Sequence, residues 1–178
     1  NRLVLGQVKV NEKSNEITAI PQLLKMLELS GCIVTIDAMG CQKNIAKLIV
    51  DKGADYVLAL KANHGDLYED VKFFFDDALK NGFGDFDYSF YESTDGDHGR
   101  IELRRYWSVS DIDWIYQKKQ WKNFTSIGMV ESERLVGDAK TVERRYYISS
   151  LDTNAKGLSY PVRGHWGIEN SLHWVLDV

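Results

Sequence analysis

The 178-residue sequence predicts an α/β protein, and two patterns carry that prediction. Between residues 20 and 80, helical and strand-like segments alternate, which is typical of parallel strands joined by right-handed helical crossovers. Between residues 82 and 150, alternating and aromatic runs are separated by turn residues, which favours antiparallel strands. We therefore expect a single domain over 1–178, with a β-rich insertion at about 82–150 ahead of a last helix.

Each expected element follows from the spacing of its apolar residues. Short β-branched runs indicate buried strands, and apolar residues three and four apart indicate helices. Pro21 is suited to the start of a helix, and Gly31 and Gly53 are suited to helix ends. The expected elements are a strand over 2–10, a helix over 20–29, a strand over 32–39, a helix over 42–52, a strand over 55–61, a helix over 65–80 and a helix from Leu158 onward.

Composition excludes several classes of protein. The chain is 44% hydrophobic and 27% charged, which is ordinary for a globular protein with a real core. No apolar run reaches the length of a membrane span and no signal peptide is visible, so we expect a cytoplasmic protein without a membrane partner. Cys32 and Cys41 are spaced too widely for a typical metal pair and are expected to be reduced thiols. Because the first residue is Asn1, we expect a piece of a longer protein.

Charge is distributed unevenly along the chain, whose formal net charge is −4. Residues 51–97 carry 4 Lys/Arg and 12 Asp/Glu, a net charge of −8, whereas residues 98–145 carry 10 and 7, a net charge of +3. A local basic surface on an acidic chain can meet phosphates, since the nearby field decides binding. An ordinary solvated surface explains the charge equally well.

Asp37 is the exceptional residue of its apolar strand, CIVTIDAM. It lies at the carboxyl end, where parallel α/β sheets form their functional crevice. The carboxylate is therefore a candidate metal ligand or base, and the alternative is an Asp that holds the following loop, MGCQK. Lys61 and Asn63 end the neighbouring strand and are expected to face the same crevice as possible DNA contacts.

Glu169 is the second candidate carboxylate, in the segment RGHWGIENSLHWVLDV. His165, Glu169 and His173 are spaced by four residues and therefore share one face of a helix. Asp37 and Glu169 together would make a hard-oxygen site suited to Mg²⁺ or Mn²⁺. Zinc is less suited, because the two His are eight apart, unlike the HExxH spacing. A packing stripe is the remaining alternative.

A basic face is expected on the segment HGRIELR, where residues 98, 100, 102 and 104 share one face of a strand. His98, Arg100 and Arg104 fit contacts to phosphate groups. A cross-strand ion-pair ladder through Glu102 is an equally good interpretation. The three tryptophans at 107, 114 and 121 are expected to be core residues more often than platforms for bases.

Four motifs in order resemble the DDE transposases of bacterial insertion sequences, and most closely the branch of H-repeat-associated proteins. They are VTIDAMGCQKNIAKLIVDKGADYVLALKANHGDLYEDV, HGRIELR, YYISSL and RGHWGIENSLHWVLDV. The resemblance covers essentially the whole chain. It implies an RNase H-like mixed sheet flanked by helices, with the β-rich insertion before the last helix, and two Mg²⁺ or Mn²⁺ ions held by acidic residues.

The resemblance also assigns roles to residues. It implies that Asp37, in the TIDA motif, and Glu169, in the WxIE motif, are catalytic metal ligands in cleavage and strand transfer of DNA. The position four before Glu169, Arg in related transposases, is His165 here, with Arg163 close by, and both are candidate DNA contacts. The family's Lys position is Leu176 here. The implied partners are the ends of an insertion sequence, its target DNA and, in the active state, a second copy in the bacterial nucleoid.

The family's first Asp lies on a strand upstream of LVLGQVKV, which these residues do not contain. We therefore expect one or more central strands and the third carboxylate to be missing, and these 178 residues to have little activity alone. Two alternatives to a transposase core are a catalytically inactive DNA-binding remnant of such an enzyme and an RNase H-like nuclease.

Overall fold

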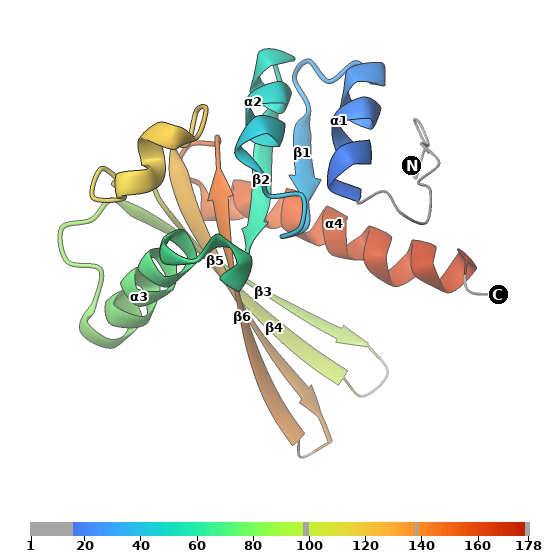
Figure 1. Cartoon of the computed structure of the whole chain (residues 1–178). Coiled ribbons are helices and arrows are strands. Elements are labelled where there is room, and N and C mark those ends of the chain that lie inside the picture. The colour runs from blue at the N-terminus through green and yellow to red at the C-terminus, as the bar shows by residue number, and fades with distance from the viewer. Residues whose placement is uncertain (1–15, 98–99, 138, 177–178) are drawn as a thin grey trace.

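The computed structural model describes residues 16–97, 100–137 and 139–176, with side chains described for 17–96, 101–137 and 139–167. In this part of the chain, four α-helices and two 3₁₀ turns accompany a six-stranded mixed sheet of order β1-β2-β6-β5-β4-β3 (Figure 1). The elements are α1 (Glu16–Met26), β1 (Ile33–Ile36), α2 (Lys43–Asp51), β2 (Asp55–Leu60), η1 (Ala62–His64), α3 (Asp66–Asn81), β3 (Tyr88–Asp97), β4 (Arg100–Val109), η2 (Tyr116–Gln120), β5 (Ser126–Val136), β6 (Ala139–Ser149) and α4 (Ala155–Leu176).

The parallel half of the fold is confirmed. β1 and β2 pair in parallel, with Ile33 opposite Asp55 and Ile36 opposite Leu58, and α2 connects them. The apolar face of α2 is fully buried through Ile45 and Ile49. Gly53 follows the helix with a φ of +74°, a conformation in which glycine has no side chain to strain. Both strands therefore end at the same edge of the sheet.

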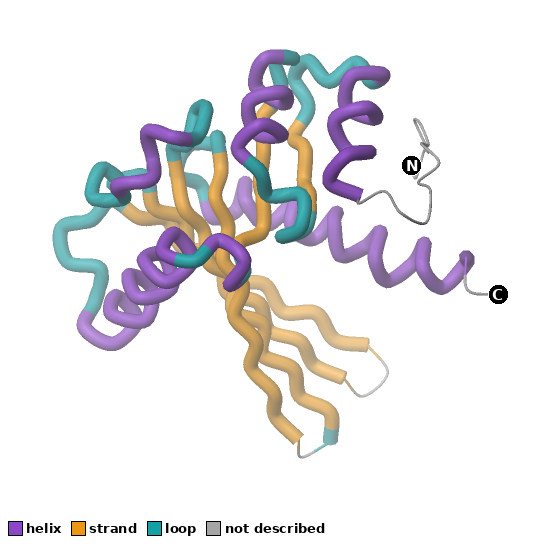
Figure 2. The backbone as a smooth tube through the Cα atoms, in the orientation of Figure 1, coloured by secondary structure: helices purple, strands orange, loops and turns teal. Residues whose placement is uncertain are grey.

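The β-rich segment extends the same sheet. β6 pairs antiparallel with β2, with Val57 opposite Ser149, and β5, β4 and β3 follow as antiparallel neighbours. These four strands are long and continue past the helices at one end (Figure 2). At the other edge, β1 pairs with β2 alone within the described residues. The mixed sheet agrees with the RNase H-like architecture that the resemblance implies.

Two helix starts differ from the expected positions. Pro21 lies inside α1, more than a turn from Glu16, although a proline has no N–H to donate to the preceding turn. α4 begins at Ala155 because the Asn154 side chain caps it, Oδ1 accepting the N–H of Gly157 at 2.7 Å. The strand expected over 2–10 lies outside the described residues.

The sheet separates two apolar clusters. Helices α1, α2 and α3 cover one face, where Phe75, Met129 and Ile148 are fully buried among many others. On the other face, α4 packs against a smaller cluster around Tyr106 and Val130, with Leu158 and Val162 as its own contribution. Figure 1 shows α4 crossing the sheet and continuing beyond β1. Among the described residues, no helix has the length and apolar character needed to cross a membrane.

Gly128 allows α4 to approach β5 closely, because a Cβ there would lie 2.5 Å from Cδ2 of Leu158. Gly128→Ala should cost about 1–3 kcal/mol through overpacking. Leu158→Ala should cost about 2–5 kcal/mol through a cavity. The double variant should lose about 1 kcal/mol less than the sum, since each change relieves the other. Urea unfolding of the four proteins measures this coupling, and strict additivity would show that the two residues do not press on each other.

Candidate active site

Asp37 follows the last residue of β1 and is held in a tight loop. Its Oδ1 accepts the backbone N–H groups of Met39 at 3.1 Å and Gly40 at 3.2 Å. Gly40 is required here, because a Cβ would lie 2.2 Å from Cγ2 of Ile36. The loop-holding role foreseen for Asp37 is therefore present. Oδ2 has no hydrogen bond within the described residues, so the carboxylate keeps one oxygen for another partner.

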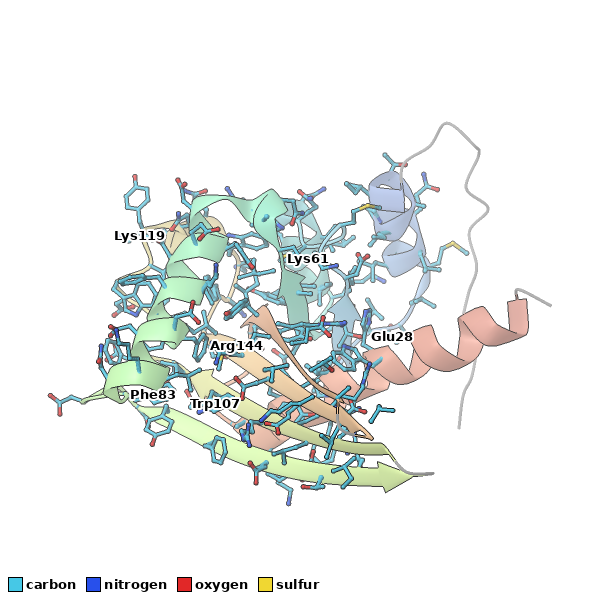
Figure 3. The ribbon with its side chains drawn as sticks, turned by 90° about the horizontal axis from the view of Figure 1, so that it is seen from below. Glu28, Lys61, Phe83, Trp107, Lys119 and Arg144 are labelled. Atoms are coloured by element: carbon cyan, nitrogen blue, oxygen red, sulfur yellow. The ribbon has the colours of Figure 1, made fainter. Side chains whose placement is uncertain are left out.

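The exposed side of Asp37 opens into a cleft between the ends of β1 and β2, the middle of β6 and α4. Lys61, which follows the last residue of β2, lines the same cleft and is exposed. Figure 3 labels Lys61 and Arg144, the latter on β6. Thr35, Glu143, Arg145 and His165 also line the cleft. The structure thus gathers one carboxylate of the predicted pair and several cations.

His165 fixes α4 to β1, the strand that precedes Asp37. Its Nδ1 lies 3.3 Å from Oγ1 of Thr35, which lines the same cleft two residues before Asp37. Glu169 lies one helical turn further along α4 and therefore on the same helix face. The side chains of Glu169 and His173 lie outside the described residues. That the carboxylates of Asp37 and Glu169 approach each other remains a prediction, which the backbone of α4 favours.

Trp166 supplies the second anchor of α4. The guanidinium carbon of Arg145 lies 4.1 Å from the centre of its ring, and that of Arg104 lies 5.6 Å away. Such cation–π contacts contribute about 0.5–2 kcal/mol each. Trp166 also packs against the small apolar cluster beneath α4. The helix turn that precedes Glu169 is consequently held by contacts with β1, β4 and β6.

Several predicted DNA contacts have protein partners. Arg104 pairs with Asp95 at 2.7 Å and with Glu102 at 2.9 Å. Arg163 pairs with the same Asp95 oxygen at 2.8 Å. The ion-pair ladder considered as the alternative is therefore present at Arg104. The side chains of residues 98 and 100 lie outside the described residues.

Asn63 has a structural contact at the same edge of the sheet. Its Nδ2 donates to the backbone oxygen of Ala38 at 2.9 Å, which ties the turn after β2 to the loop after β1. Any direct role of Asn63 with DNA remains a prediction. Cys41 lies in the same loop and is fully buried, and burial, assisted by the charge of Asp37, raises the pKa of its thiol. Both cysteines are free thiols, as expected.

Sequence reasoning missed the residues that β6 brings to the cleft. Arg144 and Arg145 are adjacent in the segment KTVERRYYISS, which is distant in sequence from both acidic motifs. Their place in the cleft depends on β6 pairing with β2, where Leu60 lies opposite Tyr146. The register of a strand pair decides which side chains face one side. Only the alternation of the strand could have indicated them.

A divalent ion would need more ligands than the described side chains supply. Within that part of the chain, no three His, Cys, Asp or Glu groups are arranged to hold a metal ion. Asp37 lines the cleft and its Oδ2 accepts no hydrogen bond within the described residues, so it fits one ligand of Mg²⁺ or Mn²⁺. His165 is engaged with Thr35 rather than placed as part of a zinc cluster.

Comparison with known proteins agrees with this geometry. The family model described as a transposase DDE domain matches residues 1–178. The chain is 44% identical over 183 residues to the "Putative transposase YncI" of Escherichia coli O157:H7, covering 100% of this chain and 46% of that protein. It is 41% identical over 184 residues to the "H repeat-associated putative transposase YhhI" of Escherichia coli K12, covering 99% and 47%.

A protein of Xanthobacter autotrophicus described as "Uncharacterized protein in dhlA 3'region" is 44% identical over 150 residues, 84% of this chain and 49% of that protein. The chain spans about half the length of the curated relatives it matches. The family match over every residue and the mixed α/β sheet lead to the same conclusion. The chain belongs to the DDE transposase family.

Proposed function

We propose that this chain forms part of the catalytic core of a DNA transposase that cuts and joins the strands of an insertion sequence. The observation that supports this most is the position of Asp37, at the carboxyl end of β1, in a cleft whose other wall is the turn of α4 that precedes Glu169. A carboxylate on a strand end facing one on a helix is suited to metal-assisted phosphoryl transfer.

In this proposal Asp37 and Glu169 hold Mg²⁺ or Mn²⁺. When bound, two such ions activate the attacking oxygen and stabilise the leaving oxygen of an in-line displacement. The protein's contribution is orientation. The hydrogen bonds from Met39 and Gly40 fix the rotamer of Asp37, so its Oδ2 has one direction available. The Thr35–His165 contact sets the distance between β1 and α4.

DNA is the proposed partner, and the cleft supplies the charges that would hold it. Lys61 is exposed and has no ion pair within the described residues, so its ammonium can meet a phosphate. Arg144 is more constrained, because Glu131 and Asp76 bind its guanidinium. His165 occupies the position of an Arg in related transposases, and we assign it to positioning α4. Activity as a homodimer is part of the same proposal.

DNA affinity should depend on the charge at the cleft. Lys61→Glu should weaken binding of a duplex oligonucleotide and reduce the slope of log affinity against log salt by about 1, because one phosphate contact is lost. Lys80→Glu is the matched control, since Lys80 is exposed at the end of α3 among acidic residues. Fluorescence anisotropy over a salt series measures both. Equal losses for the two variants would contradict a DNA site at the cleft.

Strand cleavage should require a third carboxylate, because two carboxylates offset poorly the repulsion between two divalent ions. These 178 residues should show little or no plasmid nicking in Mg²⁺ or Mn²⁺. A longer chain that includes the third carboxylate implied by the resemblance should nick DNA, and Asp37→Ala or Glu169→Ala should each reduce the rate by at least about 10²-fold.

Two results would change the proposal. Robust cleavage by the 178 residues that both substitutions abolish would show that two carboxylates suffice. A longer chain that binds DNA but never cleaves it would identify the protein as the DNA-binding remnant instead.

A further inference from the structure

A second surface, which shares no residue with the cleft, is formed by α3, the start of β3 and the segment before η2. We call it the aromatic–acidic surface and define it by its exposed rings and its carboxylates. The rings are Phe73, Phe86, Tyr88, Phe90 and Trp114, exposed by 36–75%, and the carboxylates are Glu69, Asp70 and Asp77. Figure 1 shows α3 covering the face of the sheet opposite α4.

Of the exposed rings, Trp114, Phe86 and Tyr88 are held in place by neighbouring rings. Trp114 stacks on Phe74 with 5.2 Å between centres, and Phe86 meets the same ring edge-on at 5.0 Å. Tyr88 stacks on Phe83 at 4.2 Å. These three rings are ordered before a partner arrives, so they lose little side-chain freedom on binding. Figure 3 labels Phe83 where the chain leaves α3.

The surface is also hollowed. A shallow depression is lined by Phe73, Phe74, Phe83 and Trp114 together with the acidic side of α3. Gly82 and Gly84 also line it at the end of α3, with φ values of +90° and +57°. These conformations suit glycine and turn Phe83 back toward the helix. Exposed apolar area of this kind, rimmed by polar groups, is typical of sites that bind another protein, a membrane or a ligand.

The charge of the rim decides the kind of partner. The depression is lined by Glu69, Asp70 and Asp77. Two further carboxylates, Asp85 and Asp87, flank the lining residue Phe86 in the sequence. Glu69 and Asp70 form no ion pair within the described residues. A nucleic acid would be repelled here by its phosphates. A polypeptide with Lys or Arg side chains beside apolar ones would be attracted by both features.

We propose that the aromatic–acidic surface is a docking site for a basic segment of another protein, which inserts an apolar side chain between Phe73 and Trp114 and pairs its cations with Glu69, Asp70 and Asp77. The acidic side of α3, with Glu69, Asp70 and Asp77, is then an attachment surface separate from the DNA-facing cleft. This inference does not depend on catalysis, because the surface shares no residue with the cleft.

The test uses two fluorescent amphipathic peptides of equal length, one of Leu and Lys and one of Leu and Glu, with the full 178-residue chain. The Lys peptide should bind and the Glu peptide should not, and the affinity should fall as salt is raised above about 0.1 M. Phe73→Ser and Asp70→Lys should each weaken the Lys peptide at least about fivefold. Tyr160→Ser is the matched control, since Tyr160 is 66% exposed on α4 and Phe73 is 75% exposed on α3.

Three results would overturn the proposal. The first is equal binding of the Lys peptide by Tyr160→Ser, Phe73→Ser and Asp70→Lys proteins that keep the circular dichroism of the parent. The second is displacement of the Lys peptide by a duplex oligonucleotide whose own binding to the chain is abolished by Phe73→Ser. The third is a sedimenting dimer that Phe73→Ser dissociates, which would make a second copy of the chain the occupant.

Discussion

The packing of α4 across the sheet is the constraint on which the candidate site depends. Asp37 is fixed by its own loop, but Glu169 belongs to a helix whose described side-chain contacts with the sheet lie in its earlier turns. Leu158 packs against Gly128, and the Trp166 ring contacts the guanidinium groups of Arg104 and Arg145. The His165 ring contacts the hydroxyl of Thr35. Since a helix transmits position rigidly over one turn, these contacts set where the carboxylate of Glu169 can be.

The same sheet uses much of its charge for internal pairing. Glu92, Arg105, Glu131 and Arg144 lie directly opposite one another on β3, β4, β5 and β6. Neighbours in this row form ion pairs, with N–O distances of 2.9 Å for Glu92–Arg105, 3.0 Å for Arg105–Glu131 and 2.7 Å for Glu131–Arg144. Glu131 is only 8% exposed, so its charge would be costly without both arginines. The net positive charge of 98–145 therefore overstates what is available to DNA, and Lys61, outside that segment, is the better candidate.

The elements were largely predictable because their signals are local. Apolar spacing located α2, α3 and the parallel strands, and Gly53 ended α2 as expected. The start of α4 was misplaced because Asn154 was not recognised as its cap. Asp37 was identified as exceptional from its apolar neighbours, and the structure places it in a cleft.

What the sequence could not predict depends on pairing between distant segments. Arg145 lies in the cleft and contacts Trp166 because of the register of β6 beside β2 and β5. Asp95 forms ion pairs with Arg104 on β4 and Arg163 on α4, and no local sequence pattern indicates these pairs. The aromatic–acidic surface was visible as an acidic block, but its rings gather only when α3 meets the start of β3.

The most direct test of a shared metal site is a double-mutant cycle on Mn²⁺ affinity, followed by electron paramagnetic resonance of the free ion. Asp37→Asn keeps the oxygen that accepts from Met39 and Gly40, so the loop is preserved while the charge is removed. Glu169→Gln is the partner change. If one ion contacts both carboxylates, each single variant should weaken Mn²⁺ binding by about tenfold and the double variant little further. Independent, additive losses, or no loss from Glu169→Gln, would show that the two carboxylates do not share a site.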